Sequence, residues 1–337
     1  MKKALFFILP LLIVGLFYSL DKTTKRVKVP FNIDKALKEK ATKEYLEENI
    51  KKELTKNELE EAQALVDIAS YLKVDINHSL INTLEDKKSS IDRFFKKSGD
   101  FFSGFFSGKV HNSASLAGSV SSDFTIVGDV RDIYKEGSKY LNNESYNRFI
   151  LSLSLLGVGL SITTLSSFGA SAPLKVATST LKSAKRSRYL NPKFTLVLEK
   201  KLQKSVDLKT LKKIDLSSFK GIKNSRKIIA KSIHLKPIKS TFKNIAAIKK
   251  NTSTIDTLKI LRYIDSEKEL QKALKVTQKY KKNSYGVFKV LGKKTFKGAK
   301  FIIKKTTLYF FTLFSLIISA LFWIIVVFYI IFSFIKK

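Results

Sequence analysis

Three long stretches of this 337-residue chain contain no charged side chain, and they constrain its fold more than any other feature. They are residues 4–20, 149–174 and 308–335. An α-helix needs about 20 apolar residues to cross the hydrocarbon core of a bilayer. The carboxyl-terminal stretch exceeds this length and has lysines on both sides, so it predicts a tilted transmembrane helix.

The amino-terminal stretch, residues 4–20, is shorter and follows Lys2 and Lys3. A positive charge before an apolar segment is typical of a signal peptide or a signal anchor. Because no small-x-small cleavage site follows, we expect an uncleaved anchor that forms a transmembrane helix.

The middle stretch, residues 149–174, is long enough to span a bilayer but is diluted by serines, threonines and glycines. Glycine weakens an isolated helix, whereas small residues let membrane helices approach closely. We expect a transmembrane or re-entrant segment here. The alternative is a buried helical hairpin in a soluble domain.

Charge is distributed unevenly around the middle stretch. Residues 21–148 hold 22 Lys and Arg against 21 Asp and Glu, whereas residues 171–307 hold 37 against 7. Basic residues near membrane segments favour the cytoplasmic side. Three spans with the amino terminus inside would place the neutral region outside and the basic region inside.

Two other topologies remain open. Two spans with both termini outside would place all of residues 21–307 in the cytoplasm, and this suits the lysines that flank residues 308–335. Two spans with both termini inside would export the basic region, against the usual charge distribution.

The regions between the apolar stretches have helical patterns. The sequence Thr55-Lys-Asn-Glu58 has capping-box spacing, and the apolar residues behind it repeat as in a helix that packs on residues 36–54. Ser266 predicts another helix start. We therefore expect a mostly α-helical integral membrane protein with two or three transmembrane helices. Its parts would be a charge-balanced helical region at 21–148 and a basic region at 175–307, helical in its second half.

Four cations follow the middle stretch and are candidates for contact with lipid or a partner. They are Lys182, Lys185, Arg186 and Arg188. Basic clusters beside a membrane attract anionic headgroups, and an acidic protein would offer the same charge.

Residues for catalysis or metal binding are scarce. The chain has no Cys, and His78, His111 and His234 are far apart. It contains no phosphate-binding GxxxxGK[ST], HExxH or GxSxG motif. We therefore predict no enzymatic activity, no metal site and no cofactor.

One acidic cluster stands out. Asp129, Asp132 and Glu136 are spaced to share one helix face after Gly128, which suits a turn into that helix. A metal or ion site or a partner contact is one interpretation of the cluster, but we expect a helix start with a solvated acidic face.

The same cluster carries a family resemblance. Val127-Gly128-Asp129-x-x-Asp132, then Gly157 and Gly159, Pro173-x-Lys175 and Leu181-Lys182 resemble pre-toxin segments of bacterial polymorphic toxins. Such segments usually lie between a secretion module and a toxic domain. The resemblance covers about residues 123–190, and here a basic region and an apolar stretch follow it.

The sequence as a whole predicts a multi-pass protein of the bacterial inner membrane. We expect a non-enzymatic scaffold or interaction protein that contacts the lipid bilayer and binds anionic lipid or an acidic partner. One alternative is a membrane-permeabilising effector related to toxins. Another is a membrane-tethered nucleic-acid binder.

Overall fold

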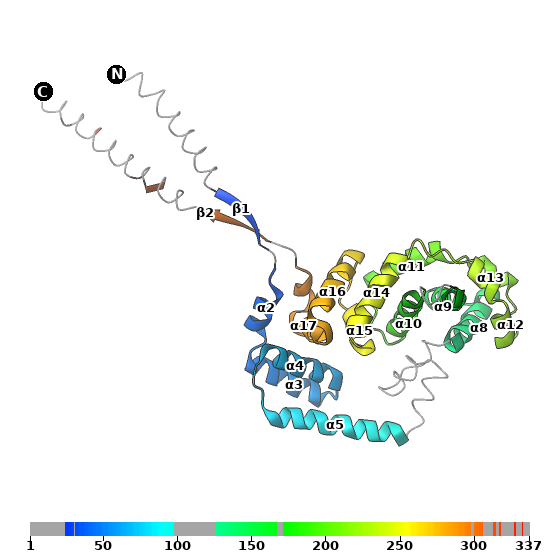
Figure 1. Cartoon of the computed structure of the whole chain (residues 1–337), viewed down its shortest axis with the longest axis horizontal. Coiled ribbons are helices and arrows are strands. Elements are labelled where there is room, and N and C mark those ends of the chain that lie inside the picture. Colours follow the sequence, from blue (N-terminus) through cyan, green and yellow to red (C-terminus); the bar gives the residue numbers. More distant parts are fainter. Residues whose placement is uncertain are drawn as a thin grey trace. The chain divides into compact units, whose positions relative to one another are not determined.

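The computed structural model describes residues 24–29, 31–97, 126–166, 171–297 and 300–305, with five single positions between 313 and 332. The chain divides into two compact units (Figure 1). The larger runs from Ile33 to Phe296, and the smaller combines the residues before and after it. The predicted transmembrane helices at 4–20 and 308–335 lie outside the continuously described residues. Among the helices that are described, none has the length and apolar character needed to cross a membrane.

A two-stranded antiparallel ribbon forms the described part of the smaller unit. In it β1 (Thr24–Val29) pairs with β2 (Lys300–Lys305), so that Thr24 lies opposite Lys305 and Val29 opposite Lys300. An antiparallel pair brings the start of one strand beside the end of the other. The chain segments before β1 and after β2 therefore leave the ribbon from the same end. Both strands fall in regions that were predicted to be helical. The prediction failed here because each strand pairs with a segment that is distant in the sequence.

The larger unit begins with helices that confirm part of the sequence pattern. They are α2 (Ile33–Lys40), α3 (Lys43–Thr55), α4 (Leu59–Leu72) and α5 (His78–Lys97). Helix α4 packs on α3, as predicted. The predicted capping box does not form, because the Thr55 hydroxyl donates to the carbonyl of Lys51 at 2.9 Å and Glu58 makes no side-chain cap.

Helix α9 (Arg148–Ser166) is enclosed by other helices and packs against α8 (Ile126–Leu141) and α10 (Ala172–Arg186). Every residue from 149 to 161 is buried. A helix with apolar side chains on every face is buried, either in the core of a protein or in a lipid bilayer. Here protein surrounds it, so the expected transmembrane or re-entrant segment is corrected to a buried core helix.

Helices also fill both halves of the basic region, although helices were expected only in its second half. They are α11 (Pro192–Ser205), η1 (Leu208–Lys213), α12 (Phe219–Asn224), α13 (Arg226–Lys231), α14 (Lys239–Asn251), α15 (Thr254–Leu261), α16 (Glu267–Tyr280), η2 (Lys281–Asn283), α17 (Ser284–Leu291) and η3 (Gly292–Phe296). Short helices start at side-chain caps such as Ser218 and Ser253. The predicted start at Ser266 is confirmed, since its hydroxyl accepts from the Glu269 amide at 3.3 Å.

The charge-balanced and basic regions pack together in this one unit. Helix α17 lies against α4, and a Cβ on Gly286 would be 2.5 Å from the carbonyl oxygen of Ala64. A second link joins α15 to α4, where the Nζ of Lys259 lies 3.2 Å from Glu61 Oε1 and both residues are buried. Regions joined in this way cannot lie on opposite faces of a bilayer. The packing of the larger unit is therefore incompatible with the three-span topology, which places the two regions on opposite sides of the membrane.

Candidate functional site

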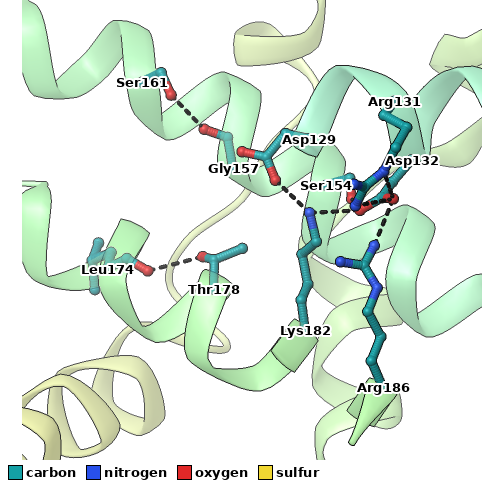
Figure 2. A network of polar contacts seen from close by, with 10 residues as sticks. All are labelled: Asp129, Arg131, Asp132, Ser154, Gly157, Ser161, Leu174, Thr178, Lys182 and Arg186. Atoms are coloured by element: carbon teal, nitrogen blue, oxygen red, sulfur yellow. Dashed lines mark hydrogen bonds and ion pairs between the residues drawn. The ribbon is translucent and has the colours of Figure 1, made fainter. Parts of the chain in front are cut away.

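Lys182 lies in a buried ion cluster that joins α8 to α10 (Figure 2). Its Nζ is 2.8 Å from Asp129 Oδ1 and 2.6 Å from Asp132 Oδ2. Lys182 is 0% exposed and Asp129 is 1% exposed. The prediction that Lys182 contacts lipid or a partner does not hold, because the ammonium group has no access to either.

Asp132 links this pair to two arginines. Its Oδ1 lies 2.6 Å from Arg186 Nη2 and 3.2 Å from Arg131 Nη2, and its Oδ2 accepts from the Ser154 hydroxyl at 3.2 Å. Burial alone would raise the pKa of Asp132, but the charges of Lys182, Arg186 and Arg131 hold it below its usual value. Arg186 is thus also part of the cluster, but its side chain remains 14% exposed, so its contact with lipid or a partner stays a prediction.

Two glycines of α9 explain how the helices approach so closely. A Cβ on Gly157 would lie 2.2 Å from Asp129 Oδ2, so only glycine leaves room for this carboxylate (Figure 2). A Cβ on Gly159 would lie 2.0 Å from Ile233 Cδ1, on the segment after α13. Among the residues of the pre-toxin resemblance, Gly157 thus leaves room for Asp129, which in turn pairs with Lys182.

The three acids that were predicted to share one solvated face of α8 differ in their surroundings. Asp129 and Asp132 point into the ion cluster, so they are not part of a solvated face. Glu136 is half-buried and accepts from the Asn147 amide at 2.7 Å. No group of three His, Cys, Asp or Glu side chains that could hold a metal ion occurs in the described part of the chain. The cluster is a structural element that positions α8 and α10 on α9.

The other two candidate cations remain accessible. Lys185 is half-buried, with its Nζ 5.5 Å from the centroid of the Phe149 ring, and Arg188 is exposed. Contact of these two residues with lipid or a partner stays a prediction.

A second group of cations lies on η1, α12 and α13. All eight are exposed, and none forms an ion pair within the described residues. They are Lys209, Lys212, Lys213, Lys220, Lys223, Arg226, Lys227 and Lys231. Asp215 is the single acid among them, and Ser217 donates to its carboxylate through both its amide and its hydroxyl. We call these eight cations the basic surface.

Apolar side chains are exposed within the basic surface. Phe219 is 56% exposed and Ile228 is 41% exposed. The Phe219 ring meets the Tyr134 ring edge to face, with centroids 5.7 Å apart. Ile222 and Ile229 are wholly buried and fix α12 on α8 and α13 on α9. The basic surface is therefore a fixed array of cations with apolar side chains between them.

The sequence contained a signal for this surface. Between residues 209 and 231 it has eight cations against one acid, with Phe219 and Ile228 among them. The segment does not stand out in the sequence, because cations are frequent throughout residues 171–307. The folded structure distinguishes this segment from the rest of the basic region. Cations elsewhere, such as Lys259, Lys289 and Lys293, form ion pairs with acids.

No family model matches the chain, and neither a curated protein nor a solved structure matches it. The resemblance of residues 123–190 to pre-toxin segments stays a prediction. The geometry of the basic surface and of the ion cluster is what bears on the function of this chain.

Proposed function

We propose that this chain is a non-enzymatic, membrane-anchored interaction protein. Its two terminal apolar stretches hold it in the cell membrane, and its basic surface binds anionic lipid. The observation that carries the proposal is the set of eight exposed cations around Phe219 and Ile228, which form no ion pair with any residue that the structure describes. A binding role needs no reactive group, in keeping with the scarcity of candidate catalytic residues.

The ribbon supports an anchor of two membrane segments. The pairing of Thr24 with Lys305 makes residues 4–20 and 308–335 depart from the same end of β1 and β2. If both stretches cross the bilayer, both termini lie on one side and the larger unit lies on the other. Basic residues next to both stretches, including Lys25 and Lys304, favour the cytoplasm for the larger unit.

The chemistry of the basic surface favours lipid as its partner. Each Lys or Arg close to an anionic leaflet contributes about 1 kcal/mol of attraction. Exposed Phe219 and Ile228 can enter the headgroup region beside those cations. A membrane anchor also keeps the surface at a high effective concentration relative to lipid.

The permeabilising alternative relied on residues 149–174 and 308–335 to insert in a bilayer. Burial of residues 149–161 of α9 within protein favours the anchored interaction protein over it. The nucleic-acid alternative shares the same cations and is an outcome of the experiment below.

The test uses the full chain in lipid nanodiscs, with a single cysteine at the exposed Asn224 carrying an environment-sensitive dye. The chain has no other cysteine. We expect a blue shift when phosphatidylglycerol replaces part of the neutral lipid, and we expect salt to reverse it. Changing Lys220, Lys223, Arg226 and Lys227 to Gln should abolish the shift.

A matched control removes four exposed cations from elsewhere in the larger unit: Lys268, Lys275, Lys282 and Lys294. This variant has the same net charge and should keep the shift. Equal loss in both variants would attribute the effect to overall charge and overturn the proposal. So would a dye that responds to single-stranded nucleic acid and not to anionic lipid.

A further inference from the structure

A hollow of about 530 Å³ opens at the start of α9, between the end of α8, α10 and α11. Its size lies within the usual range for small-molecule sites. Its wall is mostly polar, and Arg148 and Phe149 form the first turn of α9 there. Exposed amides in the first turn of a helix favour a negative charge nearby.

Three cations line this hollow. Lys139, Arg148 and Lys185 form no ion pair within the residues that the structure describes. Two acids are also present, but the Glu136 carboxylate already accepts from the Asn147 amide. The hollow thus presents more positive than negative charge, and Glu199 remains as a hydrogen-bond acceptor.

Ser152 gives an independent indication of a ligand. It is 2% exposed, it lines the hollow one turn into α9, and its hydroxyl has no hydrogen-bond partner among the described residues. The Ser152 oxygen is not fully buried, so it is reached from the hollow, where a ligand would complete its hydrogen bonding. The other buried serines of α9 instead bond within the protein, since Ser154 donates to Asp132 and Ser161 to the carbonyl of Gly157.

A second hollow of about 390 Å³ shares part of the wall. Tyr146, Arg148 and Gln203 line both, and the second adds Lys204, Lys209 and His234. Arg148 therefore stands between the two spaces, where its guanidinium can hold an anion by two parallel hydrogen bonds.

We infer that the hollow at the start of α9 binds a phosphate ester of a small hydroxylated molecule. Arg148, Lys139 and Lys185 bind the phosphate, and the Ser152 hydroxyl donates to one of its oxygens. Glu199 and Gln203 accept from or donate to the hydroxyl groups. This site is separate from the basic surface and does not depend on the proposed function. Its ligand is either a soluble phosphate ester or the headgroup of a phospholipid.

Calorimetric titration of the full chain in neutral-lipid nanodiscs tests this site, with glycerol 3-phosphate and inorganic phosphate as probes. We expect saturable binding that is tighter for glycerol 3-phosphate. The double change Lys139→Gln and Arg148→Gln should weaken binding at least about tenfold, since hydrogen bonds to charged groups are the strong ones. Ser152→Ala should weaken it about fivefold and leaves every charge in place.

The matched control changes Lys135 and Lys200 to Gln, because both are exposed cations of α8 and α11 that do not line the hollow. It should bind as the wild type does. Nanodiscs that contain phosphatidylglycerol distinguish the two sources: a lipid headgroup in the site would suppress the heat of glycerol 3-phosphate, and a soluble ligand would leave it unchanged. Absence of saturable binding, or equal weakening in the control, would overturn the inference. So would unchanged binding by the folded Ser152→Ala variant together with the folded double variant.

Discussion

The ammonium of Lys182 and the carboxylate of Asp129 lie 2.8 Å apart although the two residues are 53 positions apart in the chain. The pair connects the helix before α9 to the helix after it. It therefore holds α8 and α10 together, and both helices also pack on α9.

Lys182→Met is expected to destabilise the protein by about 3–5 kcal/mol, because it leaves Asp129 as a buried charge without its ammonium partner. Urea unfolding followed by far-UV circular dichroism measures this. Lys185→Met, on the same helix, should cost much less because Lys185 is in contact with solvent. Adding Asp129→Asn to Lys182→Met should recover part of the loss, since Asp132 keeps Arg186. A purely additive double variant would argue against the pairing.

Gly157→Ala should destabilise the protein by about 1–3 kcal/mol, because the new Cβ would lie 2.2 Å from Asp129 Oδ2 in a packed interior. Gly137→Ala is the matched control on α8, where the nearest atom, Leu216 Cδ1, would be 3.3 Å away. There the gain in helix propensity should offset the contact. Thermal unfolding compares the two variants, and equal effects would contradict the close approach of α8 and α9.

The stability of the protein should fall in acid partly through Asp132. The cations around it hold its folded-state pKa below the usual Asp value. Its contribution is therefore complete above the unfolded pKa, about 4, and is lost as the pH falls through the lowered folded pKa. Asp132→Asn should be less stable at neutral pH and should lose less stability on acidification. Unfolding free energies measured between neutral pH and pH of about 3 decide this, and parallel profiles for the variant and the wild type would sink the prediction.

The ribbon register predicts a specific disulfide. Val27 lies opposite Ile302, so Val27→Cys with Ile302→Cys should cross-link on mild oxidation. Val27→Cys with Ile303→Cys should not, because a shift of one residue moves the side chain to the other face of the ribbon. The cross-linked form migrates differently in a non-reducing gel. Equal cross-linking of both pairs would show that this register is not fixed.

Local patterns predicted local structure in this chain, including α4 and the start of α16 at Ser266. They could not predict pairings between distant residues. The acids at 129 and 132 and the cations at 182 and 186 have helical spacing on either side of the uncharged stretch 149–174, and this match of opposite charges was the available signal. The apolar character of α9 was correctly recognised, but a helix surrounded by protein and one surrounded by lipid have the same pattern. The ribbon left no local signal because its strands are formed by the two ends of the chain.

The most direct test of this account is the side of the membrane on which each region lies. Single cysteines at Ser70, Asn224 and Lys337 can be labelled in intact cells with a membrane-impermeant maleimide, since the chain has no cysteine of its own. Ser70 lies in the charge-balanced region and Asn224 in the basic region, and both are exposed. We predict labelling at position 337 and none at 70 or 224 until the cells are lysed. Labelling at 70 but not at 224, or the reverse, would place a bilayer between the two regions and contradict the packing of the larger unit.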